Sequence, residues 1–197
     1  MLHITFSSPS VLAYTAGKNE QVPDDFADFP VVAMQQTHSN TVALVEAAPN
    51  HTIEDCDALI TAVPKLQLQL KHADCLPILI YHPSKVIAAV HAGRKGTEAF
   101  IIENVLLTLQ RKFSIHDSLE IWMGPAICKR CYQIDPTADL HYDLLTHNTQ
   151  QIRSLFPESN ATIAYSNLCT AHQNEKFYSY RKEGSGVPMN VTGIILR

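Results

Sequence analysis

Two side chains that can bind a metal or act in catalysis, the Cys75 thiol and the His91 imidazole, stand near the outer ends of two apolar runs in KHADCLPILIYHPSKVIAAVHAGRKGT. The residues HPS between the runs suit a three-residue hairpin loop, with Tyr81 facing Lys85. That register predicts that Cys75 lies opposite His91 on one face of the sheet, with Cβ atoms about 5 Å apart. A slip of one residue would place them on opposite faces, so the register decides whether they meet.

A turn rich in glycine and positive charge follows the second apolar run. It consists of Gly93, Arg94, Lys95, Gly96 and Thr97. Thr97 is predicted to cap a helix through EAFIIENVLLTLQRKF. Glycines let backbone N–H groups approach a ligand, while the two cations and the helix N-terminus favour negative charge. We therefore expect this turn to bind phosphate or a carboxylate.

A third potential metal ligand, His38, lies in QQTHSN, a predicted turn between two strands. Two imidazoles and one thiolate are typical zinc donors, and three protein ligands leave a fourth position for water or substrate, as in catalytic zinc sites.

Asp74 is a candidate for proton handling or for contacting a substrate base, or else for orienting a ligand histidine. Two alternatives need no metal: Cys75 could be a nucleophile with His91 as its base, or both could be ordinary packed side chains of the sheet.

A second group of cysteines and histidines imitates a zinc finger. Cys128 and Cys131 form a CxxC pair, with His141 and His147 downstream. The nine residues before the first histidine are fewer than the usual spacing of about twelve. We interpret the pair as ordinary thiols near the wall of the site, and His172 as a solvated loop histidine.

The remaining pattern predicts the elements that must position these residues. The runs LHITF, VVAMQQ, TVALVE, LQLQLKH and LEIWMG are predicted strands, and CLPILIY and VIAAVHA are strands covered on both faces. Pro136 suits the first turn of a helix reaching about Phe156, with Leu140, Leu144 and Ile152 on one side. The tail FYSYRKEGSGVPMNVTGIIL reads as two strands joined by a loop. Because no strict βαβ rhythm and no nucleotide-binding glycine motif occurs, we expect an α+β fold with mixed or antiparallel sheets.

Length and composition narrow the class of protein to which the chain could belong. The 197 residues suggest a single domain over 1–197, and the formal net charge of −4 argues against a nucleic-acid or membrane partner. No apolar run approaches the roughly 20 residues of a membrane span, and no signal peptide is recognised at the N-terminus. The odd count of five cysteines favours reduced thiols and a cytoplasmic enzyme.

Several motifs together resemble one family. DALIT, ADCLPILIY, AVHAGRKGT, GPAICKRCYQID and CTAHQNEKFYSYRKEG occur in the order and approximate spacing of the laccase-domain family. That family was first labelled multicopper polyphenol oxidase, and later described as purine nucleoside phosphorylases with adenosine deaminase activity and as peptidoglycan-editing factors. The resemblance implies a single-domain four-layer α/β/β/α sandwich and a zinc site, with His38, Cys75 and His91 as the ligands. A multicopper oxidase is not expected, because ten histidines occur without an HxH or HCH motif.

The resemblance also implies a function. We expect a zinc-dependent enzyme that phosphorolyses adenosine, inosine or methylthioadenosine and deaminates adenosine, with Asp74, Cys75 and His91 catalytic and the 93–97 turn holding phosphate. Alternatives are a peptidoglycan-editing zinc amidase on muropeptide precursors, a metal-free cysteine hydrolase and a non-catalytic binding protein. The last is motivated by the missing N-terminal TTRxGG stretch. Two further departures change arginine positions of the family: HAGRKG replaces the usual HAGWRG, and SGV replaces TGR.

Overall fold

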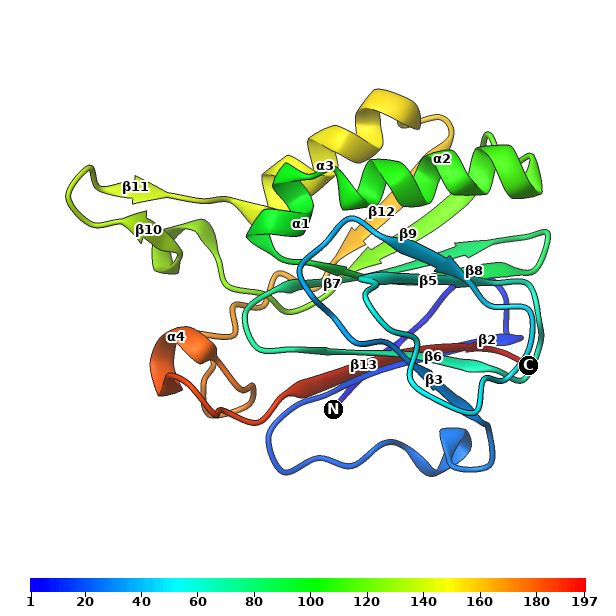
Figure 1. Ribbon diagram of the computed structural model, residues 1–197, viewed down its shortest axis with the longest axis horizontal. Helices are drawn as coiled ribbons and strands as arrows, with labels where there is room; N and C mark the ends of the chain where they lie inside the picture. Colours follow the sequence, from blue (N-terminus) through cyan, green and yellow to red (C-terminus); the bar gives the residue numbers. More distant parts are fainter.

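Two β-sheets packed face to face form the body of the protein (Figure 1). The computed structural model describes all residues, 1–197. The six-stranded sheet has the order β12 (Ala161–Tyr165), β9 (Leu119–Met123), β7 (Leu76–His82), β8 (Val86–Ala92), β5 (Ala58–Thr61) and β4 (Val42–Leu44). The five-stranded sheet has the order β1 (Leu2–Ile4), β2 (Val11–Ala16), β13 (Asn190–Leu196), β6 (Gln67–His72) and β3 (Val31–Ala33). Both sheets combine parallel and antiparallel pairs, which confirms the expected α+β fold with mixed sheets.

The predicted hairpin exists, but its register differs from the expected one. β7 and β8 pair with His82 opposite Val86 and Pro77 opposite His91, so the loop is Pro83 to Lys85 rather than HPS. Cys75 is therefore not opposite His91, and that prediction was wrong. The error is a shift of two positions along β8, which preserves the face on which each side chain lies, because side chains alternate with a period of two.

Strands β7 and β8 are covered on both faces, as their continuous apolar runs predict. Ile78 and Ile80 belong to the core under the helices, whereas Leu79 and Tyr81 belong to the core between the sheets. His91 shares the parity of Ala89, a member of the core between the sheets. Its side chain therefore points into the layer between the sheets, near the end of β8.

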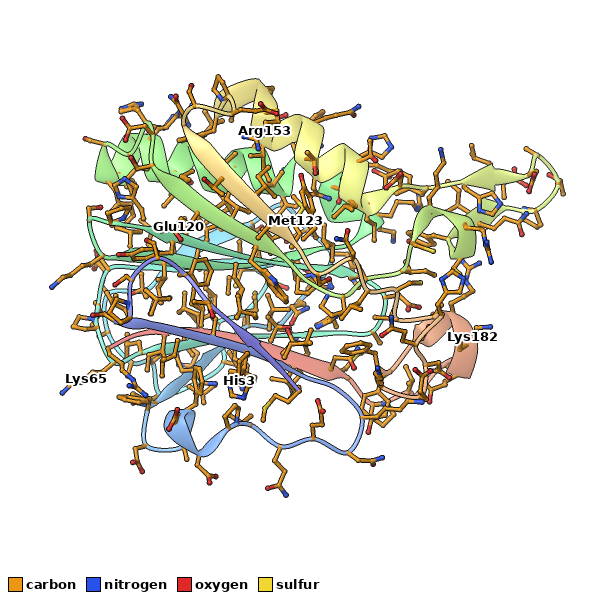
Figure 2. The ribbon with its side chains drawn as sticks, turned by 180° about the vertical axis from the view of Figure 1, so that it is seen from behind. His3, Lys65, Glu120, Met123, Arg153 and Lys182 are labelled. Atoms are coloured by element: carbon orange, nitrogen blue, oxygen red, sulfur yellow. The ribbon has the colours of Figure 1, made fainter.

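Three helices cover the outer face of the six-stranded sheet: α1 (Arg94–Glu98), α2 (Ile101–Phe113) and α3 (Leu144–Leu155). The single helix predicted after Thr97 is in fact two, because Phe100 adopts a left-handed conformation (φ 64°) between α1 and α2. Thr97 lies inside α1 instead of capping a helix. Seen from behind, Met123 of β9 lies beneath α3, which carries Arg153 (Figure 2). Thr149 of α3 contacts the Met123 sulfur at 3.7 Å.

The helix predicted from Pro136 begins later. After the short 3-10 helix η2 (Lys129–Cys131), the chain forms a projecting hairpin of β10 (Gln133–Asp135) and β11 (Leu140–His141). The Asp135 carboxylate accepts hydrogen bonds from the backbone and hydroxyl of Thr137, which stabilises a turn around Pro136. Helix α3 starts after Asp143, whose side chain accepts the Thr146 N–H at 3.0 Å as an N-cap.

The C-terminal segment contains one strand rather than two. The stretch predicted as its first strand forms the short helix α4 (Tyr180–Glu183), and only β13 enters the sheet. On the far face of the five-stranded sheet, Phe26 of the 3-10 helix η1 (Asp24–Phe26) packs against Tyr14 and Ile195. The fourth layer expected from the family is therefore a coil segment with one helical turn. None of the helices has the length and apolar character that a membrane span requires.

Candidate functional site

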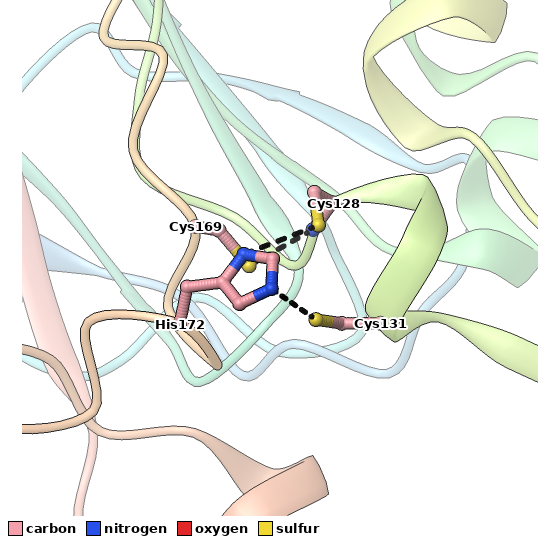
Figure 3. Close-up of side chains that lie close together, drawn as sticks. All are labelled: Cys128, Cys131, Cys169 and His172. Carbon is pink, nitrogen blue, oxygen red and sulfur yellow. Dashed lines mark hydrogen bonds between the residues drawn. The ribbon is translucent and has the colours of Figure 1, made fainter.

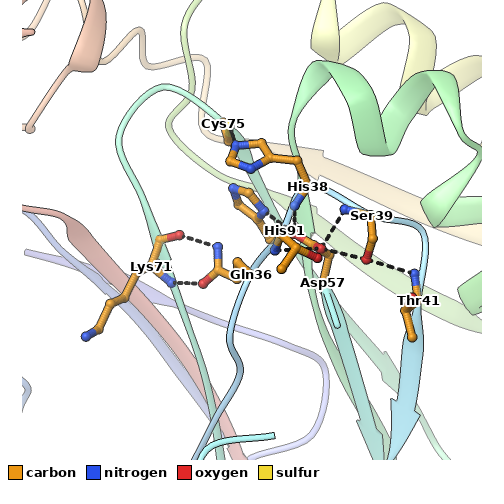
Figure 4. A network of polar contacts seen from close by, with 9 residues as sticks. Gln36, His38, Ser39, Thr41, Asp57, Lys71, Cys75 and His91 are labelled. Carbon is orange, nitrogen blue, oxygen red and sulfur yellow. Dashed lines mark hydrogen bonds and ion pairs between the residues drawn. The ribbon is translucent and has the colours of Figure 1, made fainter. Parts of the chain in front are cut away.

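The side chains of His38, Cys75 and His91 meet at one end of the layer between the two sheets (Figure 4). Each offers one donor atom, and these atoms all lie within 4.8 Å of one another. The Cys75 sulfur is 3.6 Å from His38 Nε2, and the two imidazole rings are 4.9 Å apart between centroids. His91 is buried, Cys75 is half-buried and His38 is exposed, so the cluster opens to solvent on the His38 side.

Gly93 makes this close approach possible. The observed β7–β8 register, continued past Leu76 and Ala92, places Gly93 opposite Cys75. A Cβ atom on Gly93 would lie 2.9 Å from the Cys75 sulfur and 2.7 Å from His38 Cδ2, which is closer than real contacts allow. The glycine is required here by the packing of two donor side chains against the backbone.

The buried Asp57 carboxylate organises two of the donors at once. It lies 2.8 Å from His91 Nδ1, which leaves Nε2 as the free ring nitrogen. It also accepts the backbone N–H groups of Thr37, His38 and Ser39. These bonds fix the turn in which His38 has a positive φ of 61°. Sequence reasoning missed Asp57, although it stands at the start of the motif DALIT, directly before β5.

The Gln36 side chain fastens the His38 segment to the neighbouring strand. Its Nε2 donates to the Lys71 carbonyl at 2.7 Å, and its Oε1 accepts the Lys71 N–H at 2.8 Å (Figure 4). The bonds made by Asp57 and Gln36 therefore hold the turn on both sides. A donor on such a turn is preorganised, because little conformational freedom remains to be lost when a ligand binds.

Charge coupling between the donors shifts their pKa values in opposite directions. Burial alone would raise the pKa of the Cys75 thiol, but the His91 charge and hydrogen bonds from His38 and His91 bring it down to about 6. Burial alone would lower the pKa of His91, but Cys75 and Asp57 raise it to about 9. Despite burial, hydrogen bonds from His91 and Ser39 hold the pKa of Asp57 at about 2. A thiolate is thus favoured at neutral pH, the form needed for a metal ligand or a nucleophile.

A cavity of 740 Å³ opens over the three donors. Its volume falls in the range of small-molecule sites. Apolar and aromatic side chains make up much of its lining: Met34, Ile127, Tyr132, Leu144, Tyr180 and Met189. Lys71 and Arg181 bring positive charge to it. The arrangement can hold a flat, partly apolar molecule against a polar end that carries the donor cluster.

Asp74 lies at this cavity but does not contact the histidines through hydrogen bonds. Its carboxylate accepts the Thr170 hydroxyl at 2.6 Å and the Arg181 N–H at 2.7 Å, and its carbonyl accepts the Ile127 N–H at 2.9 Å. Its backbone has a positive φ of 92°. Asp57, and not Asp74, makes the hydrogen bond that orients a donor histidine. Asp74 instead joins the two loops that form the cavity wall.

The glycine-rich turn is only partly accessible. Gly96 and Thr97 are buried; the Thr97 hydroxyl accepts from Asn148 and the Thr97 N–H is bonded within α1. Arg94 is half-buried and forms an ion pair with Glu98 at 3.0 Å, while Lys95 is exposed. An anion at this turn would therefore be held by Arg94 and Lys95. Anion binding there remains a prediction.

Two further residues at the cavity were missed in the sequence. His72 is buried, with Nε2 3.0 Å from the Thr192 hydroxyl, and its Nδ1 has no partner within the protein. Burial and the nearby His91 lower the pKa of His72 to about 3, so the ring is neutral. Arg181 is positioned by its Nη2 bond to the Gln133 carbonyl at 2.8 Å, and its guanidinium lies over the Tyr132 ring. The sequence pattern predicts a strand for the SYRKEG stretch, which contains Arg181, so the position of Arg181 at the cavity was not predicted.

The two cysteines of the CxxC motif do not form a cluster with His141 and His147, the histidines of the zinc-finger-like pattern. His141 lies beside the Lys129 carbonyl, and His147 stacks on Tyr142. Instead, Cys128 and Cys131 meet Cys169 and His172. His172 is exposed in a turn, as expected for a solvated loop histidine, but its ring also contacts both thiols of the pair, which was not predicted.

Known proteins share both the sequence pattern and the fold. A purine nucleoside phosphorylase of Campylobacter jejuni is 29% identical over 163 residues, covering 77% of this chain and 71% of that protein. One of Bacteroides thetaiotaomicron is 26% identical over 208 residues, covering 89% and 75%. Among solved structures, a Neisseria meningitidis protein superposes with a TM-score of 0.83 at 19% identity, covering 99% of this chain and 98% of that one. YlmD of Geobacillus stearothermophilus gives 0.82 at 21% identity, covering 96% and 94%.

The family described as "multi-copper polyphenol oxidoreductase laccase" matches residues 17–152. This match contains the turn of His38, the β7–β8 hairpin and the CxxC pair. It also spans more than half of the 197 residues. The chain therefore belongs to this laccase-like family.

Proposed function

We propose that this protein is a zinc-dependent enzyme of purine nucleosides, which phosphorolyses adenosine, inosine or methylthioadenosine and also deaminates adenosine. The observation that carries the proposal is the meeting of His38, Cys75 and His91 at one end of a 740 Å³ cavity with an apolar and aromatic lining. The relatives of Campylobacter jejuni and Bacteroides thetaiotaomicron are named purine nucleoside phosphorylase, and this chain matches most of the length of each. Their names support purine nucleosides as the substrate class.

The three donors fit a zinc ion chemically. Two imidazoles and one thiolate are zinc ligands, and a set of three leaves one of four tetrahedral positions open. Asp57 fixes the tautomer of His91, as carboxylates do in many zinc sites. Zinc bound here would supply Lewis acidity at the cavity end. A multicopper relay does not fit, because the second donor cluster of the chain contains three cysteines and only one histidine.

The cavity offers separate places for the parts of a nucleoside. A purine ring can stack on Tyr132 or Tyr180 and on the apolar wall beside them. One polar group at the cavity wall is available to the base, the carboxylate of Asp74.

Phosphate would be held by cations around the same opening. Arg181 lines the cavity, and Arg94 lies beside the Tyr132 hydroxyl. In phosphorolysis a phosphate oxygen bonds to the ribose C1′ while the bond from C1′ to the purine nitrogen breaks, with its electron pair leaving on the base. In deamination, water adds at purine C6 and ammonia leaves, so no phosphate is needed. We propose that Arg94 and Lys95 serve the first reaction and not the second.

The partners and compartment follow from the same proposal. The ligands are small molecules, a purine nucleoside and phosphate, with no nucleic-acid or membrane partner. All five cysteines are free thiols, which suits the reducing cytoplasm.

The decisive experiment is a substrate panel of adenosine, inosine and methylthioadenosine, each with and without phosphate, with products separated by chromatography. Phosphate-dependent release of free base supports the proposal, and conversion of adenosine to inosine without phosphate supports the deaminase part. Absence of turnover on all three nucleosides, together with release of an amino acid from a muropeptide precursor, would overturn the proposal in favour of the editing amidase.

A further inference from the structure

A second group of side chains that could hold a metal ion shares no residue with the three donors at the cavity end (Figure 3). The members of this Cys3His cluster are Cys128, Cys131, Cys169 and His172. Their donor atoms all lie within 4.8 Å of one another. The imidazole of His172 stands between two thiols, with Nδ1 3.7 Å from the Cys128 sulfur and Nε2 3.3 Å from the Cys131 sulfur.

Only one nitrogen of the His172 ring can bind the ion, and either distance is close to the separation of two ligands on one tetrahedral ion. With zinc–sulfur bonds of about 2.3 Å and zinc–nitrogen bonds of about 2.0 Å, neighbouring ligand atoms lie roughly 3.5–3.8 Å apart. Three thiolates and one imidazole form a set that zinc prefers over harder ions. Because four protein ligands complete the tetrahedron, an ion here would have no open position, and its role would be structural.

The backbone also favours a metal site at this place. Cys128 is the N-cap of η2 and Cys131 is its last residue; the Cys131 N–H donates to the Cys128 carbonyl at 3.0 Å, which brings the two thiols to one side. The Cys128 N–H donates to the Cys169 sulfur at 3.3 Å. Such an N–H bond stabilises negative charge on a sulfur ligand and belongs to the outer shell of many metal sites.

We propose that the Cys3His cluster binds a structural zinc ion that joins two loops of the cavity wall. The first loop follows β9 and carries the CxxC pair; the second follows β12 and carries Cys169 and His172. Between them the chain itself makes one β-bridge, Ala126 to Cys169, and the Cys128 N–H bond to the Cys169 sulfur. An ion with ligands from both loops adds a further cross-link between them.

The cross-link reaches the cavity through the neighbours of its ligands. Ile127, next to Cys128, lines the cavity and donates its N–H to the Asp74 carbonyl at 2.9 Å. Thr170, next to Cys169, donates its hydroxyl to the Asp74 carboxylate at 2.6 Å. The second zinc therefore positions the wall around Asp74 without touching a substrate.

Zinc content measured on protein purified under reducing conditions without added metal tests the proposal. We expect two zinc ions per chain in the parent, one in Cys131→Ser and one in Cys75→Ser. Cys56→Ala is the matched control, since Cys56 is the cysteine outside both clusters, and it should retain two. A parent with one zinc that Cys131→Ser leaves unchanged would overturn the second site, and a disulfide between Cys128 and Cys131 in the purified parent would do the same.

A measurement on the parent alone covers the case in which Cys131→Ser does not fold. In cobalt-exchanged protein, thiolate-to-cobalt absorption scales with the number of cobalt–sulfur bonds. Four such bonds per chain are expected with both sites filled, three from the Cys3His cluster and one from Cys75. Intensity for one bond would overturn the second site, whereas intensity for three bonds would retain it and count against the metal at the cavity end. The two proposals therefore fail separately.

Discussion

The Asp57 carboxylate lies 2.8 Å from His91 Nδ1 and also accepts the backbone N–H of His38 at 3.1 Å. One buried anion therefore sets the ring orientation of one donor and the backbone of the other. Neither relationship needs Cys75, yet together they aim both imidazoles at its sulfur. This makes Asp57 a positioning residue of the donor cluster.

Replacing Asp57 with asparagine is expected to weaken zinc binding at the cavity end about 10–100-fold, the usual effect of losing an outer-shell carboxylate. The amide keeps the shape, but it offers fewer acceptors for the N–H groups and no charge for the imidazole. Competition with a chromophoric chelator measures the affinity. Asp55→Asn, an exposed acid two positions away, is the control and should leave affinity unchanged. Equal effects of both changes would contradict the positioning role.

Gly93→Ala is expected to lower zinc content at the same site. The added Cβ would lie 2.7 Å from His38 Cδ2 and 2.9 Å from the Cys75 sulfur, so at least one donor must move. Metal analysis, together with the melting temperature of the metal-free protein, measures the effect. Gly96→Ala is the control, because the Cβ added there would meet the Ser39 carbonyl oxygen at 2.9 Å and not a donor atom. Loss of stability alone, with zinc retained, in Gly93→Ala would show that the glycine serves only backbone packing.

Local pattern predicted the strands that are apolar throughout, because burial on both faces leaves no ambiguity. The segment VIAAVHA became β8 with the expected limits, Val86–Ala92. Elements whose limits depend on single side-chain bonds were missed, such as the start of α3 at the Asp143 cap. Strand β2, Val11–Ala16, was not recognised, although SSPS before it and Gly17 after it are turn signals. It is paired with β1 and β13, which come from opposite ends of the chain.

The sequence predicted which residues supply the three donors of the candidate site, but it predicted their spatial arrangement less well. The three donors converge even though the expected register was wrong, because the error was an even number of residues. Asp57 and Arg181 could not be placed, because their contacts depend on how distant loops meet. The Cys3His cluster escaped for the same reason: Cys169 lies 38 positions after Cys131 in the sequence, and only the packing of two loops joins them.

His72 is expected to make the stability of the protein fall in mild acid. Its pKa is about 3 in the folded protein and 6.5 unperturbed, so between these values the unfolded chain holds one more proton. Stability from the neutral ring is complete above pH 6.5 and falls by about 1.4 kcal/mol per pH unit as the pH drops toward 3. In His72→Thr this contribution disappears, so the parent should lose more stability than the variant between pH 7 and pH 5. Denaturant unfolding at both pH values measures the difference, and parallel losses would contradict burial of a neutral ring.

Cys75→Ala is expected to abolish turnover and to remove one zinc ion per chain together, because the thiolate is one of three ligands. Metal analysis and the nucleoside assay are run on the same preparation. The control is Cys56→Ala, which should retain both activity and metal. Loss of activity with full zinc content would instead favour the reading in which Cys75 is a nucleophile and His91 its base.

Removing the cations of the 93–97 turn should separate the two proposed reactions. Arg94→Ala and Lys95→Ala are expected to raise the KM for phosphate, because phosphate is held through charge-assisted bonds worth about 1.5–3 kcal/mol each, which corresponds to about tenfold or more. The effect of Arg94 should be the smaller, since part of its charge is already neutralised by Glu98. Adenosine deamination needs no phosphate and should change little.

Arg181→Ala should raise the same KM further, because Arg181 lines the cavity itself. Lys182→Ala, the exposed cation beside it, is the control for general loss of positive charge and should leave the KM near the parent value. Initial rates at varied phosphate with saturating inosine measure each KM, and adenosine deamination without phosphate is measured in parallel. If deamination and phosphorolysis decline equally in Arg181→Ala, the arginine serves the shape of the cavity or binding of the nucleoside, and the phosphate would have to be held elsewhere.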